Sequence, residues 1–357
     1  MKILSLGLDK TILDKDSKLA HRAKAYGELV DKYVVLVPYQ ENKKVELSEK
    51  VLAYGVKSTN KIFGLWSLYS FGKKLLKQES FDLVSSQDQY FVGFVACHLA
   101  RKFKLGLEIQ IHGFEKFYGL RKKISQRILP KADSVRVVSE RLKDKLIKDF
   151  KVKESKITVV PIFVDTSHGL RKKDRGDKNF IFLSIGRLVE VKNFSLQLQA
   201  MKKVVQKFPQ ARLFILGKGP LEEQLKQEVK DLALEDFVEF KGWVDDINSY
   251  YQDADAFVLS SDSEGWGMVV VQAASFGLPI VMTDVGCAGE VIKDKESGLV
   301  VPVGDSKALT ASMLKIIKDK DLRERLVQGA KEVLDDLPDK DKTFYLYKQS
   351  WQKAIKS

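Results

Sequence analysis

Two cationic side chains, Arg187 and Lys192, lie five residues apart in the segment GRLVEVKN, directly after the apolar run FIFLSIG at 180–186. This run predicts a buried β-strand, and ligands of open α/β sheets bind beyond the carboxyl ends of the strands. Two cations at that place suit a diphosphate, which guanidinium and ammonium groups bind well. The alternative is a solvated pair of charges at the start of a helix.

A second polar segment, SEGWG, follows the apolar run AFVLS at 256–260. Glu264 stands just before small residues, and an apolar helix is predicted directly after Gly267. Small residues at such a turn let an anionic ligand approach the free N–H groups of a helix N-terminus. Gln272 lies about two turns along this helix, so that it and Glu264 could face one ligand. The alternative is an ordinary strand-to-helix turn with an acidic N-cap.

Other motifs carry little chemistry. The loop GKGPLEEQL at 217–225 has two glycines but no third at dinucleotide-binding spacing, so NAD binding is not supported. Two matches to the metal-binding pattern D-x-D, Asp253 with Asp255 and Asp14 with Asp16, are interpreted as solvated. The histidines are dispersed and the two cysteines stand far apart, so neither a zinc site nor a disulfide framework is predicted.

The elements that must position these residues alternate between short β-branched runs and amphipathic helical segments, the pattern of an α/β protein with parallel sheets. Further along the second half, the runs ARLFILG, FVEFKG and PIVMTD also predict strands. The runs in the first half that predict strands are KILSLG, YVVLVP, DLVSS, LEIQIH, SVRVVS and ITVVP.

Two Rossmann-like domains in tandem are therefore expected, at 1–166 and 167–339, with a charged linker at 165–179. The last segment, 340–357, is predicted to be a helix that packs back toward the first domain. Its packing side chains would be Phe344, Tyr345, Tyr347 and Trp351.

The net charge of +13 is unevenly distributed. Residues 1–170 hold 32 Lys and Arg against 19 Asp and Glu, whereas residues 171–357 hold 29 of each. No nucleic-acid-binding motif accompanies this charge, and no apolar run is long enough to span a bilayer. The N-terminus has no signal-peptide pattern, and the separated cysteines favour a reducing environment. We therefore expect a cytoplasmic protein that binds no nucleic acid.

A basic amphipathic element lies between Arg101 and Lys131, a segment that contains nine basic residues and two acidic ones. Such an element can bind peripherally to an anionic membrane, here the inner face of the plasma membrane. The alternative is a helix that packs on the core and has a solvated outer face. The residues assigned to this membrane or acceptor side are Phe114, Phe117, Tyr118, Arg121, Lys122, Lys123 and Arg127.

Taken together, the order and spacing of Arg187, Lys192, LGKGPLEEQLK, VEFKGWV and SEGWGMVVVQAASFGLPIV resemble the retaining glycosyltransferases of family four, glycosyl transferases group 1. The resemblance runs almost end to end and is strongest at 180–304. It implies the GT-B fold, in which two Rossmann-like domains face each other across a cleft. The domain at 1–166 would then bind the acceptor, and the domain at 167–339 the nucleotide-sugar donor.

The resemblance also implies roles for single residues. Arg187 and Lys192 would hold the donor diphosphate, Glu264 the transferred sugar, and His112 would lie close to the reacting sugar; these four are the predicted catalytic residues. A structural role for His112 is the alternative. The predicted donor-binding residues are Arg187, Lys192, Gly217, Gly242, Val244, Glu264, Gly265, Trp266, Gly267, Met268, Val269 and Gln272.

At Gln272 the chain departs from the family pattern, which has a glutamate that binds the ribose hydroxyls. The amide oxygen of glutamine can accept one such hydrogen bond, but without a charge. The first loop, LGLDKTILDKD, also lacks the paired glycines of many members.

The function expected from the resemblance is a retaining, metal-independent hexosyltransferase. It would move a sugar from a nucleotide-diphosphate sugar to a glycan or lipid-linked acceptor at a membrane surface, in cell-envelope glycan biosynthesis, with no cofactor. Two alternatives remain at this stage. One is a GT-B epimerase that acts on the sugar nucleotide, and the other is a non-catalytic basic module that binds membrane or nucleic acid and has a degenerate donor site.

Overall fold

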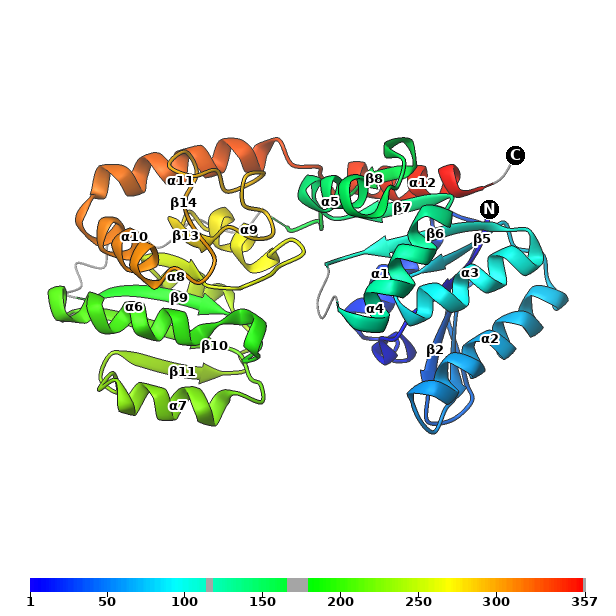
Figure 1. Cartoon of the computed structure of the whole chain (residues 1–357), viewed down its shortest axis with the longest axis horizontal. Helices are drawn as coiled ribbons and strands as arrows, with labels where there is room; N and C mark the ends of the chain where they lie inside the picture. The colour runs from blue at the N-terminus through cyan, green and yellow to red at the C-terminus, as the bar shows by residue number, and fades with distance from the viewer. Residues whose placement is uncertain (114–117, 166–178, 356–357) are drawn as a thin grey trace. The chain divides into compact units, whose positions relative to one another are not determined.

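The structure is a computed structural model of the chain, and it describes residues 1–113, 118–165 and 179–355. The chain divides into two compact units. The first comprises Met1–Pro161 and Pro338–Ser357, and the second comprises Ile162–Leu337. Each unit is built on one mainly parallel β-sheet covered by helices (Figure 1). The predicted α/β class is therefore confirmed.

The sheet of the first unit has the strand order β3-β4-β2-β1-β5-β6-β7-β8. All neighbouring strands are parallel except β3 and β4, which are antiparallel. The chain order reverses between β1 and β5, so a crevice for ligands is expected at the carboxyl ends of these two strands. The strands are β1 (Lys2–Leu6), β2 (Lys32–Tyr39), β3 (Lys43–Ser48), β4 (Val51–Lys57), β5 (Leu83–Ser86), β6 (Gly106–Ile111), β7 (Ser134–Val137) and β8 (Ile157–Val159).

In the described part of the first unit, four α-helices begin after a polar side chain that caps the first turn. Ser17, Asn60, Ser139 and Asp339 each accept a hydrogen bond from an N–H group of the helix that follows. Helix α3 packs between α2 and α4. The α-helices are α1 (Lys18–Gly27), α2 (Lys61–Gln78), α3 (Phe91–Phe103), α4 (Gly119–Ile128), α5 (Glu140–Phe150) and α12 (Lys340–Ala354), and the 3-10 helices are η1 (Lys10–Leu13), η2 (Leu129–Lys131) and η3 (Glu154–Lys156).

Helix α12 joins the first unit through a buried polar cluster. The Glu108 carboxylate is fully buried on β6 and accepts hydrogen bonds from Trp351 Nε1 (3.1 Å) and Ser350 Oγ (2.9 Å). Arg136 on β7 is 4% exposed; its Nε lies 3.3 Å from Glu108 Oε1, and its guanidinium lies 3.7 Å from the ring centre of Tyr347. This cluster fixes the C-terminal helix on the sheet.

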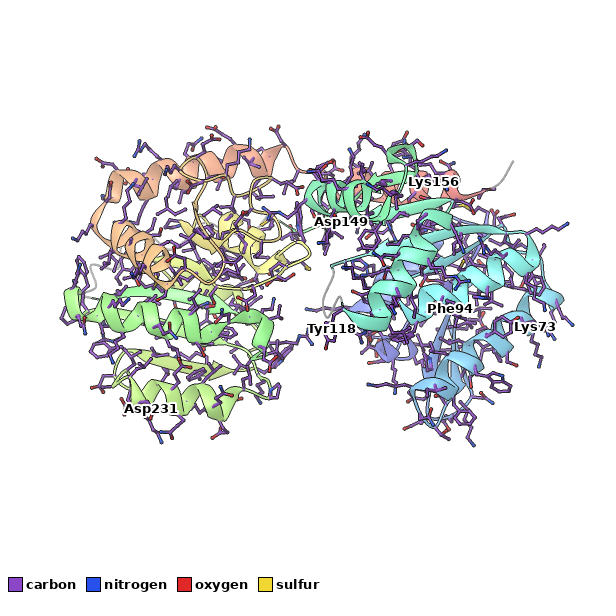
Figure 2. All side chains as sticks on the ribbon, viewed as in Figure 1. Lys73, Phe94, Tyr118, Asp149, Lys156 and Asp231 are labelled. Carbon is purple, nitrogen blue, oxygen red and sulfur yellow. The ribbon has the colours of Figure 1, made fainter. Side chains whose placement is uncertain are left out.

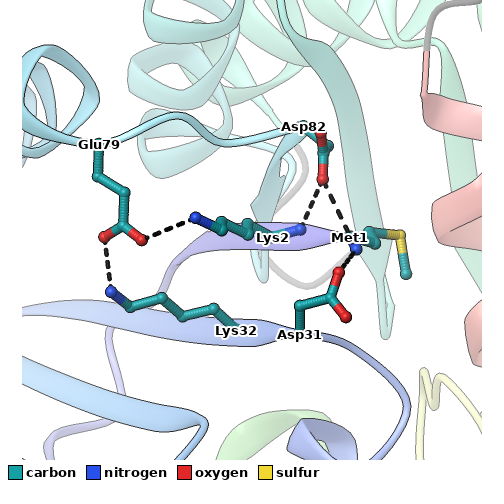
Figure 3. A network of polar contacts seen from close by, with 6 residues as sticks. All are labelled: Met1, Lys2, Asp31, Lys32, Glu79 and Asp82. Atoms are coloured by element: carbon teal, nitrogen blue, oxygen red, sulfur yellow. Dashed lines mark hydrogen bonds and ion pairs between the residues drawn. The ribbon is translucent and has the colours of Figure 1, made fainter.

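A second polar network holds the amino ends of the strands (Figure 3). Glu79, just after α2, forms ion pairs with Lys32 (2.6 Å) and Lys2 (3.2 Å). The Met1 ammonium group pairs with Asp31, and the Lys2 N–H donates to Asp82 Oδ2 at 2.6 Å. The network therefore ties β1, β2 and the end of α2 together.

The sheet of the second unit is parallel in all its described pairs and has the order β11-β10-β9-β12-β13-β14. Its chain order reverses between β9 and β12. The strands are β9 (Phe180–Ile185), β10 (Ala211–Leu216), β11 (Val238–Gly242), β12 (Ala256–Leu259), β13 (Ile280–Thr283) and β14 (Leu299–Val301).

The core of the second unit lies between this sheet and its helices. Phe182, Met201, Leu213 and Leu326 are fully buried there. The helices are η4 (Glu190–Lys192), α6 (Phe194–Lys207), α7 (Glu222–Asp231), α8 (Asn248–Asp253), α9 (Met268–Ser275), α10 (Ser306–Lys318) and α11 (Lys320–Asp335). No helix among the described residues is both long and apolar enough to cross a membrane.

The structure differs from the sequence prediction in three strands and in the limits of the units. Strands β3, β4 and β14 were not predicted: β3 is an edge strand with charged exposed positions, β4 has Gly55 in its interior, and β14 is a short strand at the sheet edge. The units change at 161/162 and 337/338 rather than at 166/167 and 339/340. Most of the predicted linker, residues 166–178, lies outside the described residues.

Candidate functional site

The predicted donor residues of the second unit follow the strands on either side of its chain reversal. Arg187 comes two residues after β9 ends, and Glu264 comes five residues after β12 ends. Because β9 and β12 are parallel neighbours, their carboxyl ends lie at the same sheet edge. The topology therefore brings two segments that are over 70 residues apart in sequence to one place.

At this edge, Lys192 and Glu264 form an ion pair. Lys192 Nζ contacts Glu264 Oε1, and Ser261 Oγ donates to the same oxygen at 2.7 Å. The side chains of Lys192 and Glu264 are 19% and 12% exposed. The two residues assigned separately to phosphate and sugar are thus in direct contact with each other. Arg187, by contrast, is exposed to solvent.

Buried hydroxyl and amide groups hold this pair in position. Gln197 on α6 donates to Ser184 Oγ on β9 and to Ser260 Oγ after β12, both at 2.9 Å. Ser260 Oγ in turn donates to the carbonyl oxygens of Lys192 (2.9 Å) and Asn193 (2.8 Å). Sequence analysis missed these positioning residues; the only signal was a serine near the end of each strand.

Only glycine fits at positions 217 and 219, because both backbones lie against neighbouring backbone. Gly217 has φ +133°, and a Cβ on it would collide with the Gly186 carbonyl oxygen. A Cβ on Gly219 would collide with the Leu188 carbonyl. The loop after β10 therefore packs backbone against backbone on the loop that carries Arg187. Gly242 lies beside them, because the Gly217 N–H donates to its carbonyl at 2.7 Å.

The loop after β13 packs against the segment EGWG. Trp266 is 2% exposed, and its carbonyl accepts a hydrogen bond from the Cys287 N–H at 2.8 Å. A Cβ on Gly286 would lie 2.6 Å from that carbonyl oxygen. Gly267 has φ +89° and begins α9, whose first residue, Met268, is 42% exposed. Gly265 and Val269 are half-buried.

Gln272 lies half-buried on α9, beside the fully buried Tyr251. Tyr251 Oη donates to the Val269 carbonyl at 3.1 Å and lies 3.5 Å from Gln272 Oε1. Burial raises the pKa of Tyr251, so its hydroxyl stays a neutral donor. The predicted site residue Val244 is half-buried in the loop after β11, where Trp243 Nε1 donates to Asp245 Oδ1 at 3.1 Å.

In the first unit, His112 follows β6 and lines a pocket of about 40 Å³ together with Arg22, Gln87 and Gln110. The protein surroundings lower the pKa of His112 to about 4, first by desolvation and then through the charges of Arg136 and Arg22. His112 is also exposed to solvent, which opposes part of this desolvation. His112 is then neutral at pH 7.

The predicted membrane side of the first unit is placed in part. Phe114 and Phe117 lie outside the described residues. Helix α4 carries the basic residues Arg121, Lys122, Lys123 and Arg127, and it buries Ile128 while Leu120 at its start is 62% exposed. Arg121 lies over the ring of Tyr90, 5.3 Å from its centre. Tyr118, just before the helix, is 72% exposed.

The D-x-D matches have local structural roles. Asp255 Oδ2 accepts a hydrogen bond from the Ile181 N–H at 2.8 Å, and Asp14 Oδ1 accepts one from the Asp16 N–H at 3.1 Å. Among the described residues, no group of three His, Cys, Asp or Glu side chains is arranged to hold a metal ion.

Two α/β units, each built on a mainly parallel sheet, are characteristic of the GT-B class of fold. The second unit carries a polar site where its chain order reverses. Residues 33–168 match the family model of Glycosyltransferase Family 4, and residues 169–333 match that of Glycosyl transferases group 1. The chain therefore belongs to these glycosyltransferases, and the predicted family and fold are confirmed.

Three known proteins illustrate the similarity. A lipopolysaccharide core biosynthesis glycosyltransferase, LpsE of Rhizobium meliloti, is 32% identical over 43% of this chain and 44% of its own length. The glycosyltransferase MJ1178 of Methanocaldococcus jannaschii, whose function is uncharacterised, is 26% identical over 89% of this chain and 85% of its own. The crystal structure of Anabaena HepE in complex with UDP superimposes with a TM-score of 0.78 at 19% identity, covering 99% of this chain and 100% of HepE. The chain spans less than half the length of LpsE, the curated relative named first.

Proposed function

We propose that this chain is a retaining, metal-independent hexosyltransferase. The second unit binds a nucleotide-diphosphate sugar at the ends of β9 and β12, and the first unit binds the acceptor, a glycan or lipid-linked molecule at a membrane surface. The observation that carries this proposal is the Lys192–Glu264 pair, held by Ser261 at the chain reversal of a family glycosyltransferase domain.

The pair suits the chemistry of a sugar-phosphate bond. When the bond from the sugar C1 to the phosphate oxygen breaks, negative charge grows on the departing diphosphate, and a fixed cation stabilises it. Lys192 is that cation, and the exposed Arg187 supplies a second cation for the same group. Glu264 keeps Lys192 in place and accepts hydrogen bonds from sugar hydroxyls.

Transfer with retention needs no protein nucleophile. The bond from C1 to the diphosphate oxygen breaks, the acceptor oxygen bonds to C1 on the same face, and the acceptor proton passes to the departing phosphate oxygen. The neutral His112 in the first unit's pocket accepts a hydrogen bond from a hydroxyl group. HepE binds UDP, which makes UDP-sugars the first donors to test.

A thermal-shift panel of UDP-, GDP- and ADP-sugars, run with EDTA, tests the donor site. A ligand that binds only the folded protein at about 100 times its Kd stabilises it by about 2.7 kcal/mol. We expect one nucleotide class to raise the Tm of the wild type, and Lys192→Met to lose most of that shift because it removes the cation but keeps the side chain's bulk.

The matched control is Lys226→Met. Lys226 also pairs with glutamates, Glu222 (2.9 Å) and Glu223 (3.0 Å), but its side chain is 42% exposed on α7 and has no contact with Glu264. This variant should keep the full shift. If no sugar nucleotide stabilises the wild type, or if Lys192→Met responds as strongly as the wild type, the proposed donor site is wrong.

A further inference from the structure

The first two turns of α2 expose large apolar side chains. Ile62 is 80% exposed, Trp66 65% and Phe63 56%. Three such residues within five positions form a contiguous apolar surface, which soluble surfaces rarely carry without a partner. Asn60 caps this helix by accepting hydrogen bonds from the Ile62 and Phe63 N–H groups at 3.0 Å, so the turn that presents them is well formed.

The neighbouring helices add exposed apolar residues at the same sheet edge. Helices α2, α3 and α4 follow the parallel strands β4, β5 and β6, so all three begin at the carboxyl ends of the strands. Phe94 in the first turn of α3 is 40% exposed and Leu120 in the first turn of α4 is 62% exposed. Figure 2 labels Phe94 on α3, Tyr118 just before α4 and Lys73 on α2.

The same three helices carry only positive charge. They contain ten Lys and Arg residues and no Asp or Glu. In the described part of the chain, no ion pair joins any of the ten to a carboxylate, whereas lysines of α5 pair with Glu140 and Asp149. The ten residues are Lys61, Lys73, Lys74, Lys77, Arg101, Lys102, Arg121, Lys122, Lys123 and Arg127.

On α2 the apolar and basic residues share one face. At 3.6 residues per turn, Ile62, Phe63, Trp66, Lys73, Lys74 and Lys77 fall within an arc of about 120°. Gly64, Leu68 and Leu76, which are buried, lie outside this arc. A helix lying flat on a surface would therefore present apolar side chains from its N-terminal half and ammonium groups from its C-terminal half.

We propose that the layer α2, α3 and α4 docks on an anionic lipid bilayer, with Ile62, Phe63 and Trp66 inserted among the headgroups. Anionic lipid matches both properties of the surface, since its headgroups attract unpaired lysines and its acyl boundary accepts apolar side chains. A nucleic acid would match the charge and could stack on Phe63 and Trp66, but it offers no apolar environment for the exposed aliphatic Ile62 and Leu120. The inference rests on the proposed function in one respect: the docked layer would bring the enzyme to an acceptor presented by the membrane.

Vesicle flotation of the full chain without any sugar nucleotide tests this surface. We expect binding to vesicles of 70% phosphatidylcholine and 30% phosphatidylglycerol, little binding to pure phosphatidylcholine, and weaker binding as salt rises. Ile62→Ser/Phe63→Ser/Trp66→Ser should lower the affinity at least tenfold at every salt concentration. Lys73→Gln/Lys74→Gln/Lys77→Gln should lower it and flatten the salt dependence.

Two matched variants serve as controls. Tyr345→Ser removes an aromatic side chain that is 52% exposed on α12, and Lys148→Gln/Lys151→Gln/Lys153→Gln removes three exposed lysines at and after the end of α5. Both should bind as the wild type does. Circular dichroism melting of each variant checks folding, and retention of the donor-induced Tm shift separates this test from that of the donor site.

Three results would overturn the proposal: no preference for the anionic vesicles, wild-type binding by the apolar triple variant, or losses in the control variants as large as those in α2. A different result would assign the charge to nucleic acid. In that case the wild type would not bind vesicles but would bind a DNA duplex tightly, and the apolar triple variant would keep this DNA binding.

Discussion

The ion pair between Lys192 and Glu264 sets how the proposed donor site can act. Both side chains are mostly buried, and removing one partner of such a pair leaves an uncompensated charge. A diphosphate that approaches Lys192 therefore adds a second anion to a cation already held in place by Glu264 and Ser261. The geometry is fixed before the ligand arrives, which reduces the reorganisation needed at the moment of reaction.

His112 gives a prediction about pH. Its pKa is lowered in the folded protein, mainly by desolvation and further by Arg136 and Arg22. The unfolded chain therefore binds the proton more tightly, and His112 reduces stability as the pH falls from about 6.5 toward the folded pKa. NMR titration of the four histidines should find His112 with a pKa below 6.5. A value at or above 6.5 would contradict the description of this pocket.

The variant His112→Asn identifies the signal and checks the linkage. It should remove one titrating resonance and make stability less dependent on pH between about 4 and 6.5.

At the scale of elements, the buried cluster under α12 offers a test of what holds the first unit together. Arg136→Met should lower the free energy of unfolding by about 3 to 5 kcal/mol, because it leaves the Glu108 carboxylate buried without its cation. Glu108→Gln should destabilise the wild type but recover part of the loss in the Arg136→Met background, since it removes the buried charge while its amide oxygen still accepts from Trp351 and its NH2 group can donate to Ser350 Oγ. Urea denaturation followed by circular dichroism measures both.

Lys148→Met on α5 is the control, because its side chain is exposed, and it should change stability by less than about 0.5 kcal/mol. If Arg136→Met proves as mild as this control, or if Glu108→Gln makes the double variant worse by its full single effect, the two side chains are not coupled through charge.

Most elements could be predicted from the sequence because their apolar runs are buried in the sheets. Strand β6, for example, is buried at every residue, and its run LEIQIH was predicted as a strand. Strand β3 alternates exposed charged positions with buried ones at the edge of the sheet, and this weakens its signal. Helix α2 shows another limit, since Ile62 and Trp66 are apolar residues that the sequence cannot distinguish from core residues.

The sequence could predict that the candidate residues follow neighbouring strands, but it could not predict the contacts between them. The spacing of Arg187, Lys192 and Glu264 and the strands before them pointed to one sheet edge. The sequence did not reveal that Lys192 pairs with Glu264, because an ion pair between distant segments leaves no local pattern. The sequence also did not reveal the two hydrogen bonds of Gln197, because they form only where α6 lies next to β9 and β12 in the fold.

At the scale of the whole molecule, charge and chemistry are divided between the units. The excess positive charge belongs to residues 1–170, while residues 171–357 have equal numbers of basic and acidic residues. The unit with the proposed donor site, Ile162–Leu337, holds 24 Lys and Arg against 28 Asp and Glu, whereas the unit with the proposed docking layer holds 37 against 20. This division fits a protein that binds a soluble donor with one unit and meets an anionic surface with the other.

The stereochemistry of donor turnover tests the central claim most directly. Water replaces the acceptor when the sugar nucleotide found in the thermal-shift panel is incubated with the protein and EDTA, and proton NMR identifies the first anomer released. Retaining, metal-independent transfer predicts that an α-linked donor releases the α-anomer first, and that Lys192→Met loses this activity while Lys226→Met keeps it. Release of the β-anomer first, an isomerised sugar nucleotide, or turnover only with an added divalent cation would contradict the account.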